Sequence, residues 1–274
     1  MEILKAILFG LVEGITEWLP ISSTGHMILL DELVHLNVTS EFYKLFEVVI
    51  QLGAILAVVV IYFKTLLPWG FGKDKEDTKN TISLWLKVIL ACIPAAVIGL
   101  LFDDWFDEHF YNAQTVAIAL IAYGVIFIVM DNIKKLSSRD TRSLNTVTWR
   151  EAIGVGIFQL LALIPGTSRS GSTIIGGLVF GLDRKTAADF TFILAIPVMF
   201  GASLLKVVKY IASGAVMSAL EFEILAVGCV VAFLVSVIVI KFLINYLKKH
   251  GFKAFGIYRI ILGIIVLAYF FLIK

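Results

Sequence analysis

The chain has 274 residues, of which 59% are hydrophobic and 16% are charged, and its formal net charge is only +2. Its mean hydropathy of +0.96 excludes an ordinary soluble protein, whose surface needs more charged side chains. The basic residues are spread over several short loops, so no nucleic-acid partner is predicted. Long apolar runs, in place of short alternating segments, predict an all-α polytopic membrane protein that forms a single integral membrane domain over residues 1–274.

In chain order, the first element is an apolar helix over 2–18, followed by a second short helix over 22–36. Pro20 separates them, because it lacks an N–H and disfavours the helical conformation in the preceding residue. Each helix is too short to cross a bilayer comfortably. Residues 2–36 are therefore predicted to form a re-entrant hairpin, which requires surrounding protein or a wet cavity.

This hairpin carries polar side chains that are costly in apolar surroundings and by default indicate function. Glu13 and Glu17 lie four apart, on one face of the first helix, and carboxylates suit Mg²⁺ or Ca²⁺. Ser22, Ser23 and Thr24 supply hydroxyl groups, and His26 follows Ser23 by three residues. The alternatives are an interfacial helix that exposes the two glutamates and a structural role for the histidine.

The remaining apolar runs predict six spanning helices. Their expected ranges are 42–63, 83–102, 113–133, 186–210, 222–247 and 253–273.

A second interrupted region, 151–181, lies between the third and fourth spans and contains the run Pro165-Gly166-Thr167-Ser168-Arg169-Ser170-Gly171. It repeats the order of a short apolar helix, a proline break, a hydroxyl-rich turn and another short helix. At an offset of 146 residues, Glu13 corresponds to Gln159 and Ser22 to Ser168. Three further pairs share this offset: Gly10 with Gly156, Gly25 with Gly171, and Phe46 with Phe192. An internal duplication with halves of about 1–135 and 150–274 is the working hypothesis.

Loop charges predict the orientation of the chain in the membrane. Loops 64–87 and 131–150 and the turn near 248–253 are rich in lysine and arginine, whereas loop 102–112 is acidic. The positive-inside rule places the basic loops in the cytoplasm and both termini outside. The two hairpins then enter from opposite sides, so the two halves form an inverted-topology repeat whose broken helices meet near the middle of the bilayer.

If the two hairpin tips meet, an anion site faces a cation site. Glycines, helix-starting N–H groups and the planar donors of Arg169 suit a phosphate, while Glu13 and Glu17 suit a divalent metal. Metal-bridged phosphate chemistry needs charge neutralisation, a nucleophile and a proton carrier. The predicted nucleophile is Ser23, activated by His26. Attack by His26 itself, or by water with His26 as base, are the alternatives.

The run from Glu13 to His26, together with Pro165 to Ser170 and Thr173, closely resembles the bacterial undecaprenyl pyrophosphate phosphatases, the bacitracin resistance proteins. The segments Phe46–Gly53 and Ile257–Arg259 are also similar to that family. The resemblance implies a metal-dependent phosphatase of the bacterial cytoplasmic membrane. It would remove one phosphate from undecaprenyl diphosphate on the extracytoplasmic side and recycle the lipid carrier of peptidoglycan synthesis.

Three roles are assigned to side chains on this basis. Ser23, His26, Glu17 and Arg169 are predicted to be catalytic, and Glu13 with Glu17 to bind the metal. The residues predicted to bind substrate are Ser22, Thr24, Thr167, Ser168, Ser170 and Thr173. The expected partners are a polyprenyl diphosphate lipid and the bilayer, and a homodimer is compatible with the sequence. The alternative function is an anion or lipid-phosphate transporter or scramblase, since inverted repeats with broken helices are common in transporters.

Overall fold

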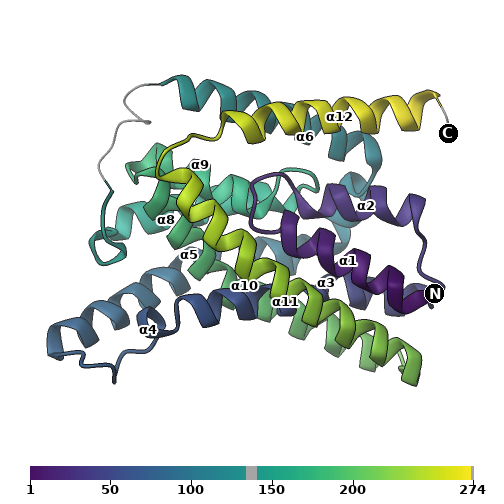
Figure 1. Cartoon of the computed structure of the whole chain (residues 1–274), viewed down its shortest axis with the longest axis horizontal. Coiled ribbons are helices and arrows are strands. Elements are labelled where there is room, and N and C mark those ends of the chain that lie inside the picture. The colour runs from purple at the N-terminus through teal and green to yellow at the C-terminus, as the bar shows by residue number, and fades with distance from the viewer. Residues whose placement is uncertain (134–140, 273–274) are drawn as a thin grey trace.

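Six long apolar helices dominate the structure, a computed structural model that describes residues 1–133 and 141–272. Each of the six is long and apolar enough to cross a membrane, which confirms the predicted multi-pass, all-α class. They are α3 (Ser40–Ile61), α5 (Lys75–Phe110), α6 (Ala113–Asn132), α10 (Arg184–Ala212), α11 (Ala219–Leu247) and α12 (Lys253–Leu272). Figure 1 labels these helices and colours the chain from the N-terminus to the C-terminus.

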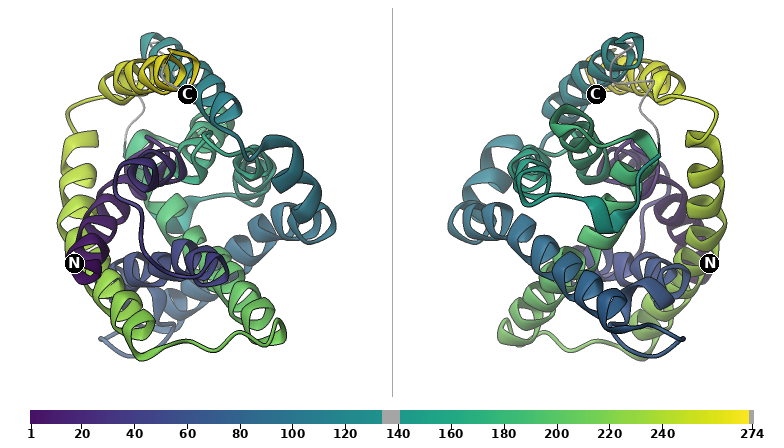
Figure 2. Two further views of the ribbon diagram at one scale, coloured as in Figure 1. Left: turned by 90° about the vertical axis from the view of Figure 1, so that its right-hand side faces the viewer. Right: turned by 90° about the vertical axis from the view of Figure 1, so that its left-hand side faces the viewer.

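Two helix–turn–helix units are built from shorter helices, and each occupies one of the two interrupted regions of the sequence. The first consists of α1 (Glu2–Thr16) and α2 (Ser23–Leu33). The second consists of α8 (Trp149–Gln159), the 3₁₀ helix η2 (Leu160–Leu163) and α9 (Arg169–Phe180). The turns of both units lie toward the middle of the molecule, as Figure 2 shows, while α6 and α12 lie side by side along one edge.

The second spanning helix differs from its prediction at both ends. It begins at Lys75 and continues to Phe110, through most of the predicted acidic loop 102–112. Residues 101–110 contain neither glycine nor proline, so the helix has no reason to stop where the apolar run stops. Trp105 and Phe110 pack edge to face on this last stretch.

The remaining short elements lie in the predicted basic loops. They are α4 (Phe63–Leu66) and the 3₁₀ helix η1 (Leu144–Thr146). Part of the basic charge predicted for loop 131–150 belongs to Lys134, Lys135 and Arg139, which fall outside the described residues.

Glycines let two pairs of helices pack backbone against backbone. A Cβ atom at Gly10 or Gly14 of α1 would approach a carbonyl oxygen of α11 to 2.7 or 2.8 Å. On the other side of the molecule, a Cβ atom at Gly124 of α6 would lie 2.7 Å from the carbonyl oxygen of Gly256 on α12. Small residues are the usual means of close helix contact in membrane proteins. These contacts hold α1 against α11 and α12 against α6.

Candidate active site

The turns of the two helix–turn–helix units share one backbone feature, a serine with a left-handed φ just before the second helix. Ser22 precedes α2 and Ser168 precedes α9, and both have a φ of 72°, a left-handed value that is rare for a residue other than glycine. Each serine caps its helix, because its side chain accepts a hydrogen bond from the backbone N–H of Gly25 or Gly171. Backbone strain of this kind is often found at functional sites.

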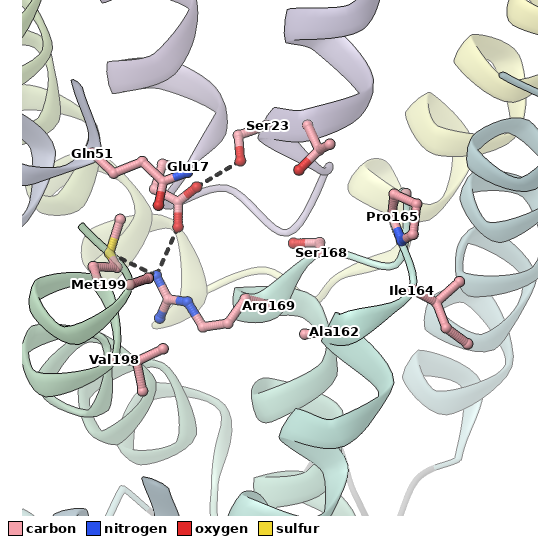
Figure 3. Close-up of a pocket in the computed structure, with 13 residues that line it drawn as sticks. Glu17, Ser23, Gln51, Ala162, Ile164, Pro165, Ser168, Arg169, Val198 and Met199 are labelled. Atoms are coloured by element: carbon pink, nitrogen blue, oxygen red, sulfur yellow. Dashed lines mark hydrogen bonds and ion pairs between the residues drawn. The ribbon is translucent and has the colours of Figure 1, made fainter. Parts of the chain in front are cut away.

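Glu17 joins the two turns through its carboxylate. The hydroxyl group of Ser23 donates a hydrogen bond of 2.6 Å to Oε2 of Glu17. On the other side, Nη2 of Arg169 forms an ion pair of 2.8 Å with Oε1 of the same carboxylate. Figure 3 shows Glu17 between these two partners. Acidic and basic groups that stand 152 residues apart in the chain therefore form one cluster, as the sequence predicts.

Further hydrogen bonds hold the second turn against the first. The hydroxyl group of Ser170 donates to the backbone carbonyl of Glu17 at 3.1 Å. Nη1 of Arg169 donates to the carbonyl of Thr191 on α10 at 3.0 Å, which fixes the direction of the guanidinium group. The guanidinium group also lies over the ring of Trp18, 5.7 Å from its centroid. Arg169 is therefore held by two parts of the chain outside its own helix: the first turn, through Glu17 and Trp18, and α10, through Thr191.

A pocket opens beside this cluster, and five of the predicted site residues line it: Glu17, Ser23, Thr24, Ser168 and Arg169. Gln51 of α3 extends into the same pocket next to Glu17 (Figure 3). Its apolar side is formed by η2, the second turn and α10, through Ala162, Ile164, Pro165, Val198, Met199 and Ala202. The pocket therefore has charged side chains, Glu17 and Arg169, on one side and an apolar wall on the other.

Six predicted site residues do not line the pocket: Glu13, Ser22, His26, Thr167, Ser170 and Thr173. The hydroxyl group of Thr167 donates to the carbonyls of Leu161 and Ile164, and that of Thr173 donates to the carbonyl of Arg169. Both hydroxyl groups satisfy backbone carbonyls of the broken helices. In this arrangement they support the second turn.

His26 does not form the predicted hydrogen bond with Ser23. Both of its ring nitrogens contact other groups. Its Nδ1 lies 2.7 Å from the carbonyl oxygen of Ser22, and its Nε2 lies 2.6 Å from the hydroxyl oxygen of Tyr258. A carbonyl can only accept, so Nδ1 carries the hydrogen and Nε2 accepts from the tyrosine. Ser23 instead donates to Glu17, because the first turn of α2 directs the two side chains toward different neighbours. Tyr258 stacks on the imidazole ring, a contact that spacing alone does not reveal.

Glu13 is a buried carboxylate with an unused acceptor. Its side chain is 1% exposed, and Oε1 has no hydrogen-bond partner. It lies near enough to Glu17 and Glu47 for their charges to interact. Among the residues that the structure describes, no three His, Cys, Asp or Glu side chains gather as a metal cluster. The oxygen donors of Glu13 and Glu17 nevertheless fit a hard cation, which often takes one or two carboxylates and completes its shell with phosphate and water.

Fold and site together define a multi-pass membrane protein with a clustered serine, glutamate and arginine at the junction of two broken helical units. The sequence pattern described as "Bacitracin resistance protein BacA" matches residues 6–265. The chain belongs to this family.

Curated relatives are similar over nearly the whole chain. An undecaprenyl-diphosphatase of Desulfitobacterium hafniense is 58% identical over 98% of this chain and 96% of its own length. An undecaprenyl-diphosphatase of Acetivibrio thermocellus is 54% identical and covers 100% of both chains. Another, from Enterococcus faecalis, is 54% identical over 97% of this chain and 96% of its own.

Proposed function

We propose that this chain is a membrane phosphatase that hydrolyses undecaprenyl diphosphate to undecaprenyl phosphate and inorganic phosphate. The activity would recycle the lipid carrier of peptidoglycan synthesis and confer resistance to bacitracin. The observation that carries the proposal is the Glu17 carboxylate, which binds a hydroxyl group and a guanidinium group in one pocket. The names of the relatives support the same substrate. They do not favour the alternative of a transporter or scramblase.

Ser23 is the proposed nucleophile. As its oxygen attacks the terminal phosphorus, the hydroxyl proton passes to Glu17, which already accepts a hydrogen bond from it at 2.6 Å. The bond between the terminal phosphorus and the bridging oxygen breaks, and undecaprenyl phosphate leaves with that oxygen. Water then hydrolyses the phosphoserine and releases inorganic phosphate. In this scheme Glu17 takes the place of His26 as the base for Ser23.

Arg169 and the second turn bind the phosphate. The guanidinium group neutralises charge that develops on the transferred phosphoryl oxygens, through N–H groups that its bonds to Glu17 and Thr191 do not use. Ser168 and Thr24 line the same pocket and supply hydroxyl groups. Ser22, Ser170, Thr167 and Thr173 contribute to substrate binding by fixing the shape of the two turns.

A divalent cation, Mg²⁺ or Ca²⁺, would be held by Glu13 and Glu17 and by phosphate oxygens of the substrate. When bound, it would stabilise the negative charge that develops on the leaving undecaprenyl phosphate. The unused Oε1 of Glu13 is the donor that supports this assignment.

The pocket sets which part of the lipid enters. Its volume is about 130 Å³, below the 300 Å³ or more that is typical of sites for drug-sized ligands. The diphosphate group is therefore the part that reaches Ser23. The prenyl chain would extend past the apolar wall that Val198, Met199 and Ala202 form on α10.

The two helix–turn–helix units are proposed to be re-entrant hairpins of an inverted-topology repeat. Their helices of 11 to 15 residues are shorter than the ~20 residues that a span requires. The matching φ values at Ser22 and Ser168, 146 positions apart, support the duplication. The basic loops favour termini outside the cytoplasmic membrane and a site that opens to the extracytoplasmic side.

Phosphate release from undecaprenyl diphosphate tests the proposal. Purified protein in detergent should release one phosphate per substrate molecule when Mg²⁺ or Ca²⁺ is present. The lipid product should be undecaprenyl phosphate. The control is Arg184→Lys, a change on α10 where Arg184 pairs with Asp131 and lies outside the pocket. Absence of phosphate release from the unaltered chain would refute the enzyme function.

A further inference from the structure

Arg259 of α12 binds the backbone of both turns. Its Nη1 donates to the carbonyl of Pro20 in the first turn at 3.1 Å. Its Nη2 donates to the carbonyls of Gly166 and Thr167 in the second turn, at 2.8 and 3.1 Å. The side chain is 0% exposed. One guanidinium group therefore connects the two turns from the side of the molecule where α6 and α12 lie.

Burial of this cation is compensated by carbonyl groups and aromatic rings. The guanidinium group lies 5.4 Å from the ring centroid of Tyr123 and 5.9 Å from that of Phe127, both on α6. No carboxylate is within ion-pair distance of Arg259 among the residues that the structure describes. A buried cation without an acidic partner is costly, and such a side chain is retained where its hydrogen bonds have a specific use. Here the acceptors are carbonyls that the helix breaks leave free.

The bound carbonyls adjoin the reacting groups. Pro20 lies between Glu17 and Ser23, and Gly166 and Thr167 directly precede Ser168 and Arg169. A shift of one turn relative to the other would separate the Ser23–Glu17 pair from the Arg169 guanidinium group. Displacement of about 1 Å at a catalytic centre can cost roughly 100-fold in rate.

We propose that Arg259 is a positioning residue of the phosphatase, which sets the register of the two turns so that Ser23, Glu17 and Arg169 act together. This inference rests on the proposed function. Close packing of α12 on α6 at Gly124 and Gly256 gives the guanidinium group a fixed base from which to hold both turns.

The test compares Arg259→Met and Arg259→Lys with the unaltered chain. Methionine fills a similar volume and removes all three hydrogen bonds, so kcat should fall about 100-fold while KM changes little. Lysine keeps the charge but replaces the planar fork by a single ammonium group, so its kcat should fall less. In Arg259→Ala, added guanidinium chloride at low concentration should restore part of the lost kcat. The thermal midpoint in detergent shows whether each variant is folded.

Hydrogen exchange supplies a readout that does not depend on activity. Amide exchange in residues 17–25 and 164–171 should become faster in both Arg259→Met and Arg259→Lys, and should stay unchanged in the control Arg184→Lys. Folded Arg259→Met with unaltered kcat, or unaltered exchange in both turns, would overturn the positioning role. An inactive unaltered chain would refute the phosphatase instead, and the exchange result would still decide whether Arg259 fixes the turns.

Discussion

The two helix–turn–helix units share a capping serine with a left-handed φ and differ in their charges. Ser22 and Ser168 have the same φ of 72°, and each caps the helix that follows it. The first unit supplies the carboxylate of Glu17, whereas the second supplies the guanidinium cation of Arg169. Where α1 has Glu13, the corresponding position of α8 has Gln159, also buried and without hydrogen-bond partners for its amide. Two units that end and restart a helix with the same kind of cap thus carry different chemical groups.

This difference shows how the two units divide the chemical roles of the site. The capping serines with left-handed φ recur because each unit must end one helix and start another inside the protein. The charged groups do not recur, because a phosphate-transfer site needs a nucleophile with its base on one side and a cation on the other. Reactivity is assigned to the first unit and anion binding to the second.

Replacement of the nucleophile should have the largest effect. Ser23→Ala is expected to lower kcat by roughly 10⁴-fold or more, as loss of a nucleophile does in other hydrolases. The matched control is Thr24→Ala, which removes the next hydroxyl group of the same pocket and should mainly raise KM. Steady-state phosphate release measures both. A Ser23→Ala variant that keeps its kcat and only raises KM would make Ser23 a binding residue.

Arg169→Lys tests the anion-binding half. Lysine keeps the positive charge but cannot bind Glu17 and the carbonyl of Thr191 with one planar group. We expect kcat to fall by about 100-fold, the usual effect of losing one preorganised donor. Near-normal kcat in this variant would show that the guanidinium geometry does not shape the transition state.

Glu13→Gln should change the metal requirement. Removal of one carboxylate is expected to raise the Mg²⁺ concentration for half-maximal activity by about tenfold or more. Chelation of the metal should abolish phosphate release from the unaltered chain. The control is Gln159→Asn, at the corresponding position of the second unit, which should leave the metal requirement as it is. An unchanged Mg²⁺ dependence in Glu13→Gln would remove Glu13 from the metal site.

The sequence predicts the six spans, both interrupted regions and the meeting of Glu17 with Arg169. These follow from apolar length, from Pro20 and Pro165, and from the cost of charge in apolar surroundings. The partner of His26 was not predictable, because Tyr258 lies 232 residues away on another helix, α12. The hydrogen bonds of Arg259 were not predictable either. Its acceptors are backbone carbonyls, and no residue type in the sequence indicates which carbonyls are free.

The smallest expected effects concern the caps that both units share. Ser22→Ala and Ser168→Ala should each lower the free energy of unfolding by about 1 kcal/mol, because each leaves a helix-starting N–H group without its acceptor. The corresponding glycine variants should lose less, since glycine adopts the left-handed φ without strain. Reversible unfolding in mixed detergent measures the four variants. A large loss at one serine and none at the other would contradict the equivalence of the two caps.

The central claim is that the two turns form one catalytic unit, and a double-mutant cycle tests it most directly. Glu17→Gln and Arg169→Gln should each lower kcat/KM by roughly 10³-fold, and the double variant should lose about as much as either single variant, because residues that act as a unit are not additive. Phosphate release by the four proteins completes the cycle. Losses that multiply to about 10⁶-fold in the double variant would show that Glu17 and Arg169 act independently.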